Sequence, residues 1–432
     1  MMFKIMNKTT DISIINFKNL FIPDSSNMPT RRYDLDWLRI IAFALLILFH
    51  TGMFYVENWG WHVKSAYNSQ ILENFMLIIE PWRMPILWLI AGISIKFLLV
   101  KVSLVHFISM RSIRLLIPLL FGILVIVPPQ LFIEMTYNGD LTLNYWQFTK
   151  EFFSPNSSIF SNYQSGIWPH IDVNHLWFIR SLWQYSLVLL CLTPFLNSKW
   201  VVNSMNWFFK QNGLITMMLA VFPIFIIQLN WDSEQVRYPL GFTFMLYGYL
   251  IGWNELFWKK VTINNKKLLS TYLIFYIILL IFYNLVWLDL IKGAEIKNEL
   301  MLIIGMFNYS LVRILGILAI FGFAHKYLNK KTKHLNYFNN AVYPFYILHQ
   351  TIIIVVGFNL SKLSLGPVAE PIILIISTIS CCFIGYEIIR RVEFLKPCFG
   401  LKMNANHNLS IKRLGYLLAI ALILPIGWEI VN

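Results

Sequence analysis

Ionisable side chains inside the most apolar segments are the residues of this chain best placed to do chemistry. Arg39 and His50 lie in one such segment, eleven positions apart. Eleven residues make about three helical turns and about 16 Å, so both side chains would point to nearly the same face. The spacing indicates a polar path that ends at an imidazole, a group suited to general base chemistry near neutral pH. A histidine that only hydrogen-bonds a neighbouring helix is the structural alternative.

Two arginines of the third apolar segment extend this pattern. Arg111 and Arg114 are three positions apart and would share one helical face. We expect them at the same membrane boundary as Arg39. Guanidinium groups bind phosphate oxygens in bidentate pairs, so the three arginines together suit a polyanion. Ordinary anchoring by basic residues at the cytoplasmic boundary explains either arginine taken alone.

A second group of polar residues is expected towards the opposite boundary. Glu80 and Arg83 lie close to Pro81 and Pro85. The prolines predict freed backbone carbonyls, and the two charges predict an ion pair within the helix or a functional role. The remaining candidates, from two further segments, are His175, Trp177, Arg180 and His349. Ionisable groups on several separate helices predict a polar cavity inside a bundle.

Composition places these residues in a membrane protein. Of the 432 residues, 57% are hydrophobic and 13% are charged, against roughly 25% charged in soluble domains. This excludes a disordered chain and argues against a soluble globular enzyme. A membrane-spanning helix needs about 20 mostly apolar residues. Windows of this kind fall at 37–56, 76–99, 114–133, 175–196, 212–230, 238–257, 268–288, 301–324, 341–361, 370–389 and 413–431. The predicted fold is an all-α, polytopic integral membrane helix bundle.

The basic residues test this topology. The formal net charge is +14, and 26 of the 35 Lys and Arg residues fall in segments that alternate spans place on one side. Basic residues gather on the cytoplasmic side of membranes, so the N-terminus is predicted inside and the partner is the lipid bilayer rather than nucleic acid. No cysteine pair has metal-ligand spacing, and we expect no metal and no permanently bound cofactor.

The order of these motifs resembles the membrane acyltransferase-3 family. The shared features are Arg39 followed by His50, the Arg111-x-x-Arg114 pair, and a late tyrosine before a histidine, here Tyr343 and His349 at a longer spacing. The resemblance covers roughly residues 30–402 and implies an integral membrane O-acyltransferase of about ten spans in a bacterial cytoplasmic membrane. The expected divisions are a cytoplasmic segment at 1–30, the acyltransferase domain at 31–402, and a linker with an extra C-terminal helix at 403–432.

The resemblance also implies a reaction. Acyl-CoA would be the donor of an acetyl or succinyl group, with its phosphates at Arg39, Arg111 and Arg114. His50 would act as general base or, in a variant, carry the acyl group itself. His349 or Glu80 would orient it. Residues expected on the substrate side are Arg83, His175, Trp177 and Arg180.

The acceptor is expected to be a cell-envelope glycan. The segment 134–174 and the first outer loop, which holds Trp59 and Trp61, are rich in aromatic residues. Aromatic faces can carry sugar rings, but an interfacial aromatic belt explains the same residues.

Two other classes of protein stay open. A secondary transporter or flippase of a lipid-linked sugar would also have many spans and a polar interior, although the internal repeats common in transporters are not visible. A signalling or scaffold protein leaves the buried arginines and histidines unexplained. The oligomeric state is open, and a homo-oligomer is compatible with the sequence.

Overall fold

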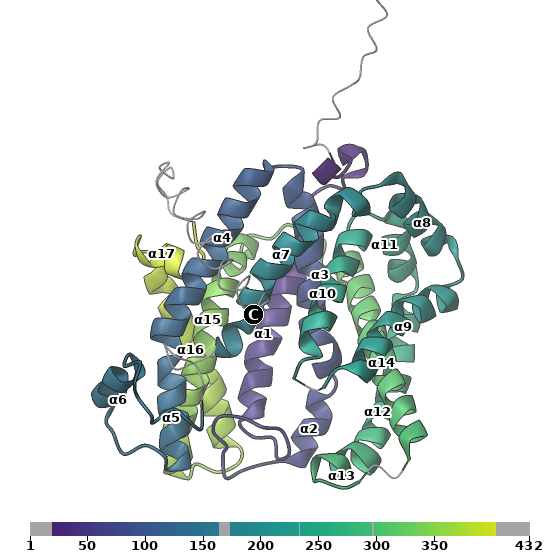
Figure 1. Cartoon of the computed structure of the whole chain (residues 1–432). Helices are drawn as coiled ribbons and strands as arrows, with labels where there is room; N and C mark the ends of the chain where they lie inside the picture. The colour runs from purple at the N-terminus through teal and green to yellow at the C-terminus, as the bar shows by residue number, and fades with distance from the viewer. Residues whose placement is uncertain (1–19, 164–172, 233, 296–297, 403–432) are drawn as a thin grey trace, which may run out of the picture.

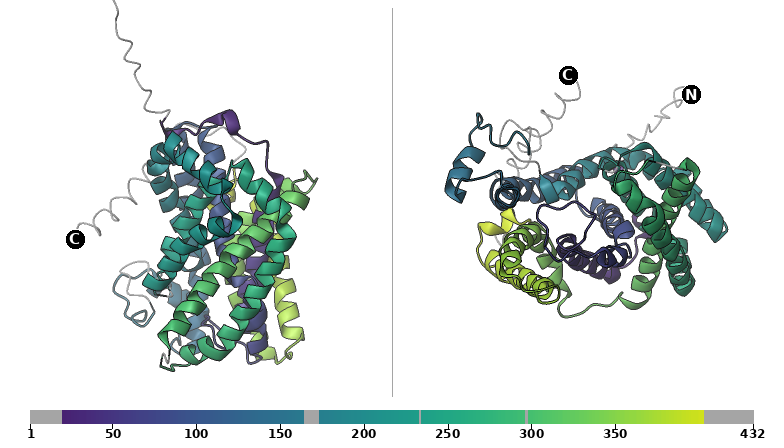
Figure 2. Two further views of the ribbon diagram at one scale, coloured as in Figure 1. Left: turned by 90° about the vertical axis from the view of Figure 1, so that its right-hand side faces the viewer. Right: turned by 90° about the horizontal axis from the view of Figure 1, so that it is seen from below.

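The computed structural model describes residues 20–163, 173–232, 234–295 and 298–402. These ranges form a bundle of helices without a strand, and α1 runs through its middle (Figures 1 and 2). Nine helical segments of the described chain are long and apolar enough to cross a membrane. They are α1 (Tyr33–Met53), α2–α3 (Gln70–Leu99), α4–η3–α5 (Leu104–Asn138), η4–α7 (Asn174–Leu196), α9 (Gly213–Asn230), α12–η5–α13 (Asn265–Ile291), α14 (Glu299–Tyr327), α15–η6 (Leu335–Leu363) and α16 (Ala369–Ile389).

Shorter helices connect these segments, and they revise the sixth predicted span. The shorter helices are α6 (Tyr145–Phe152), α8 (Lys199–Lys210), α10 (Arg237–Ile251), α11 (Glu255–Ile263) and α17 (Leu395–Cys398). The 15 residues of α10 extend about 22 Å at 1.5 Å per residue. That is less than the roughly 30 Å hydrocarbon core, so the predicted span at 238–257 is wrong in its length. The eleventh predicted span, 413–431, lies outside the described residues.

The third predicted span also begins earlier than expected. Ser103 caps α4 (Leu104–Phe121) by accepting a hydrogen bond from the backbone of His106 at 3.3 Å. The cap marks Leu104 as the first residue of the helix, so the helix starts ten residues before the predicted window at 114–133. Arg111 and Arg114 consequently lie two to three turns inside the helix rather than at its first turn.

The prolines of α3 (Glu80–Leu99) act as predicted. The backbone is broken between α2 (Gln70–Met76) and α3, and the freed carbonyl oxygens have side-chain partners. Trp82 Nε1 donates to Ile78 O at 2.7 Å, and Tyr272 also donates to that oxygen. Arg313 Nε donates to Pro81 O at 2.8 Å. Side chains thus replace the missing helical bonds, as an apolar environment requires.

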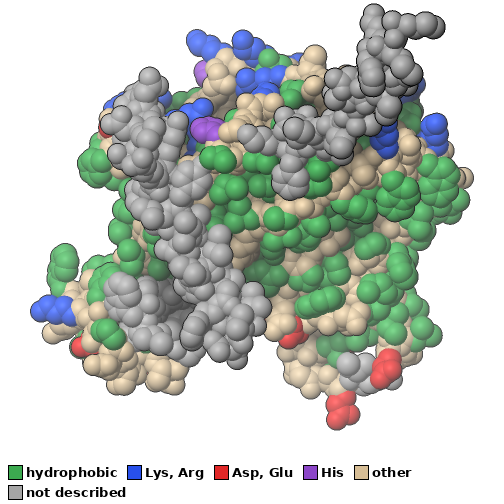
Figure 3. Space-filling view, turned by 45° about the horizontal axis from the view of Figure 1, so that its top comes forward, with side chains coloured by type: hydrophobic (Ala, Val, Ile, Leu, Met, Phe, Trp, Pro, Cys, Tyr) green, Lys and Arg blue, Asp and Glu red, His purple; other side chains and the backbone are tan. Residues whose placement is uncertain are grey.

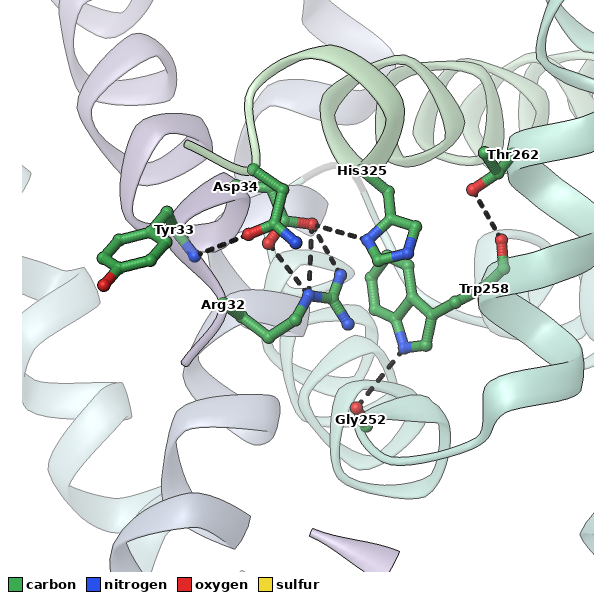
Figure 4. Close-up of polar contacts among 8 residues, drawn as sticks. Arg32, Tyr33, Asp34, Gly252, Trp258, Thr262 and His325 are labelled. Carbon is green, nitrogen blue, oxygen red and sulfur yellow. Dashed lines mark hydrogen bonds and ion pairs between the residues drawn. The ribbon is translucent and has the colours of Figure 1, made fainter. Parts of the chain in front are cut away.

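A buried charge cluster fixes the beginning of α1 (Figure 4). Arg32 donates to Asp34 Oδ1 at 2.8 Å and Oδ2 at 2.6 Å, and its guanidinium lies 3.7 Å from the centre of the Trp258 ring. His325 Nδ1 lies 3.1 Å from Asp34 Oδ2. These contacts join α1 to α11 and α14. Figure 3 shows most of the visible Lys and Arg side chains at this end of the bundle, with several Asp and Glu side chains at the opposite end.

The helices α3 and α10 approach each other through two glycines. A Cβ on Gly92 would overlap the carbonyl oxygen of Met245, and a Cβ on Gly248 would overlap that of Leu89. The obstacle is backbone in both cases, so it cannot rotate away.

We therefore expect Gly248→Leu to separate α3 from α10 and to destabilise the protein by at least about 1–3 kcal/mol, as overpacking does. Thermal unfolding in detergent measures the effect. Gly213→Ala is the control, because no atom lies within 4 Å of a Cβ there. Equal melting temperatures for the two variants would contradict this packing.

Candidate active site

A pair of imidazoles forms the centre of the candidate site. His50 Nδ1 lies 2.8 Å from His349 Nε2, although 299 residues separate them in the sequence. The rings are nearly parallel, with centroids 5.0 Å apart and an interplanar angle of 13°. His349 is 0% exposed. The two predicted catalytic histidines thus meet where α1 packs against α15 (Leu335–Leu360).

The surrounding bonds fix the tautomers of this pair. His349 Nδ1 lies 2.7 Å from the carbonyl oxygen of Tyr346. A carbonyl only accepts, so Nδ1 of neutral His349 carries the proton and its Nε2 is an acceptor. His50 must then donate from Nδ1. Its Nε2 keeps a free lone pair and has no hydrogen-bond partner among the described residues, which is the state a general base requires.

Side-chain amides connect two further imidazoles to each other, and one of them, His175, lies with its ring centroid 5.7 Å from that of His349. His175 Nε2 bonds a backbone carbonyl of α15 at 3.1 Å, so its Nδ1 is free to accept from Gln130 at 3.4 Å. Gln350 lies 3.3 Å from Gln130 Oε1 and 3.2 Å from His62 Nε2. His62 Nδ1 lies 2.6 Å from Glu134. Sequence reasoning missed Gln130, Gln350 and His62, although an amide within an apolar window is a signal that could have found the first two.

The predicted arginines lie towards the end of the bundle where α1 and α15 begin, with Arg39 on α1 and both Arg111 and Arg114 on α4. Arg39 bonds Asn339 of α15 and also lies 3.3 Å from Asp36. Both Arg39 and His50 therefore face α15, which confirms that the eleven-residue spacing puts them on one side of α1. The Nε atoms of Arg39 and Arg111 are buried and have no hydrogen-bond partner among the described residues.

A stripe of polar residues on α15 joins the arginines to the imidazoles. Tyr343 lies close enough to Arg111 and Arg114 to interact with them electrostatically, and its hydroxyl is buried without a described partner. The rings of Tyr343 and Tyr346 lie 6.5 Å apart, and those of Tyr346 and His349 6.0 Å. Residues three or four positions apart share a helical face, so this stripe is continuous.

A cavity of about 520 Å³ lies beside the His50 segment of α1, although neither His50 nor His349 lines it. Arg83, Glu80 and Trp177 line it, as do Phe49 and Met53 on either side of His50. The guanidinium of Arg83 lies 3.6 Å from the centre of the Phe49 ring, and its Nε is buried without a described partner. The predicted substrate-side residues Arg83 and Trp177 are thus brought to one cavity.

Two predicted residues are placed away from the imidazoles. Glu80 accepts a hydrogen bond from Tyr309 of α14, and no hydrogen bond joins it to His50 in the described chain. The structure therefore offers His349, and not Glu80, as the residue that orients His50. Arg180 bonds the hydroxyl of Tyr238 at 3.0 Å and does not line the cavity.

The loop between α1 and α2 covers the imidazole pair. The Trp61 and His50 ring centroids lie 5.3 Å apart, while Trp59 stacks on Phe49 at 6.0 Å and donates to Tyr283 at 2.8 Å. Lys64 Nζ donates to Met53 O and Val56 O at 2.8 and 2.7 Å, closing the end of α1, and burial lowers the pKa of Lys64 to about 8.

The aromatic residues between α5 and α7 include both buried and exposed rings. Phe148, Phe152 and Phe160 are buried together against Leu131 and Met135 of α5 (Pro128–Asn138). These three rings hold α6 to the bundle, whereas Tyr137, Tyr145, Trp146 and Phe153 are exposed. Trp168 lies outside the described residues.

Comparison with known proteins assigns the family. The family model for the acyltransferase-3 domain matches residues 32–387. The chain belongs to this acyltransferase family. Glucans biosynthesis protein C of Escherichia coli K12 is 24% identical over 396 residues, covering 86% of this chain and 95% of that protein. The protein of the same name from Salmonella typhi is 31% identical over 187 residues, covering 43% of this chain and 42% of the relative. The latter match thus spans less than half of either protein, and no solved structure matches the chain significantly.

The imidazole arrangement can be tested by ¹⁵N NMR of histidine-labelled protein at neutral pH. We expect His50 and His349 to carry the proton on Nδ1 and His175 to carry it on Nε2. In His349→Phe, which keeps a ring but removes the acceptor, the His50 signals should change. His106→Gln, a change at an exposed residue, should remove one signal and leave the others. An Nε2–H tautomer at His50 in the wild type would refute the assignment.

Proposed function

We propose that the protein transfers an acyl group from cytosolic acyl-CoA to a hydroxyl of a cell-envelope glycan, within a bacterial cytoplasmic membrane. The observation that carries the proposal is the α15 stripe, which leads from buried, incompletely bonded arginines to a histidine with a free lone pair. Family membership favours acyl transfer over the competing transporter hypothesis. The relatives' name supports a glycan as acceptor.

The distribution of charged side chains supports an orientation of the protein in the membrane. The end of the bundle where α1 begins carries most of the visible basic side chains (Figure 3), and basic residues favour the cytoplasmic side. Arg39, Arg111 and Arg114 then face the compartment that contains CoA. Three guanidinium groups whose charges repel one another gain most from a phosphate ligand, since charge-assisted bonds would offset the repulsion and satisfy the unpartnered Nε atoms.

The transfer step uses the lone pair of His50. Nε2 removes the proton of the acceptor hydroxyl while that oxygen attacks the thioester carbonyl carbon. The tetrahedral intermediate then collapses, the carbon–sulfur bond breaks, and the CoA thiolate leaves with the proton from Nε2. His349 holds the ring of His50 through Nδ1 in every step. Arg83 is the candidate donor for the developing oxyanion, because its buried guanidinium borders the cavity next to His50.

An acyl-histidine route remains the competing mechanism, in which Nε2 attacks the thioester itself. Single-turnover mixing of protein with labelled acyl-CoA in the absence of acceptor distinguishes the two. Release of one equivalent of CoA with label retained on the protein supports the covalent route, and no CoA release supports direct transfer.

The reaction is tested with purified protein, radiolabelled acetyl-CoA or succinyl-CoA, and a glycan fraction from the cell envelope. His50→Ala should lower the transfer rate by about 10²–10⁴, the usual contribution of a general base. His106→Ala is the matched control and should leave it unchanged. Failure of both donors with every glycan fraction, together with an unaltered phenotype of His50→Ala cells, would overturn the proposal.

The donor site is tested separately by CoA binding. Arg111→Ala removes a charged hydrogen-bond donor worth about 1.5–3 kcal/mol, so the Kd for CoA should rise by roughly ten- to a hundredfold. Arg391→Ala is the control, since that side chain is 71% exposed on the same end of the bundle. Isothermal titration calorimetry measures both, and equal affinities would remove Arg111 from the phosphate site.

A further inference from the structure

A second, larger cavity lies on the far side of the bundle from the arginines of α4. It has a volume of about 980 Å³ and is enclosed by α8, α9, α10, α11, α12 (Asn265–Phe282) and α14. In Figure 1 these helices lie to the right and α4 to the left. None of the residues of the proposed donor site lines this cavity, so it is a separate feature.

The walls of this cavity are apolar and its outer wall is thin. Lining side chains include Phe208, Met217, Ala220 and Leu318, and no acidic residue is among the described lining. Of the 18 residues of α9, only Val221 and Ile224 are buried by the protein. An apolar cavity does not hold water, and an empty one forfeits dispersion contacts. Within a membrane, the acyl chains of lipids surround the protein and can fill this cavity.

One end of the cavity is positively charged. Lys260 and Lys267 line it together with Asn212 and Asn264. Lys260 Nζ donates to Gln211 O at 2.7 Å, and Lys267 is exposed at the start of α12. Two lysines without an acidic residue in the same lining match a phosphate-bearing head group.

The charged end lies at the level expected of a lipid head group. The adjoining helix α8 presents Trp200 and Trp207, which are 69% and 60% exposed. Exposed tryptophans mark the interface between hydrocarbon and water. An amphiphile with its chains among Met217 and Leu318 would therefore place its head group at the membrane surface, beside the lysines.

We propose that this cavity binds an anionic glycerophospholipid. The acyl chains fill the apolar volume between α9 and α14, and the phosphate lies against Lys260 and Lys267. The lipid supplies the packing contacts that α9 lacks within the protein. The proposal does not depend on the acyltransferase reaction and makes no use of the donor or acceptor residues.

The chain offers a matched control for this site. Lysines occur in two adjacent pairs, 259–260 and 266–267, and only the second member of each pair lines the cavity. The double variants Lys260→Glu/Lys267→Glu and Lys259→Glu/Lys266→Glu therefore have the same net charge and nearly the same position in the chain. They differ in which side chains face the cavity.

The experiment uses the full-length protein, delipidated in detergent and titrated with phosphatidylglycerol, while native mass spectrometry and thermal unfolding are followed. Wild type and the Lys259/Lys266 variant should bind one lipid and melt at a higher temperature. The Lys260/Lys267 variant should bind at least about tenfold more weakly. Ala220→Phe, which narrows the apolar part of the cavity without changing charge, should also bind the lipid more weakly.

Several outcomes would overturn the proposal. These are no binding by the wild type, equal loss in the two lysine variants, or an equal response to phosphatidylcholine. Equal stabilisation by glycerol 3-phosphate would show a phosphate site without a lipid. Displacement of the lipid by CoA would assign the cavity to the donor. Should the Lys260/Lys267 variant fail to fold, an unchanged lipid affinity of folded Ala220→Phe would contradict the proposal.

Discussion

The hydrogen bond between His50 and His349 is the interaction on which the arrangement of the site depends. It lies in the apolar interior, where an unpaired polar group is costly. The carbonyl oxygen of Tyr346 accepts from Nδ1 of His349, so Nε2 of His349 must accept from His50. His50 therefore carries its proton on Nδ1, and its Nε2 keeps a free lone pair. The packing of α1 on α15 is thereby tied to a single protonation pattern. One hydrogen bond therefore both orients the proposed general base and joins the two helices.

Buried polar groups of the bundle fall into two kinds. Some have protein partners and act as structure: Arg313 donates to the carbonyl oxygen of Pro81, and Arg32 pairs with Asp34. Others keep atoms without partners among the described residues, and these include Nε of Arg39, Arg111 and Arg83. Of these three arginines, Arg39 and Arg111 lie against α15, and Arg83 lines the cavity next to His50. Where a polar group is left unsatisfied, a ligand has most to contribute.

The two cavities differ in how many charged groups line them. The cavity next to His50 is bordered by charged groups from several helices. The larger cavity is apolar except for the lysines and asparagines at one end. A reacting substrate needs fixed donors and acceptors, whereas a lipid needs volume and one charged contact. Cavity size alone would have pointed away from the candidate active site.

The sequence by itself determined the membrane bundle, the common face of Arg39 and His50, and the freed carbonyls near Pro81. Each follows from composition or helical spacing within one segment, which are local properties. It did not determine that His349 meets His50 or that Glu80 bonds Tyr309 instead. Nor did it determine that Gln130 and Gln350 bridge His175 and His62. Those contacts join residues on different helices, and only the packing of the bundle fixes which faces meet. Residue spacing determines which side chains share a face of a helix. Which other helix packs against that face is determined only by the tertiary structure.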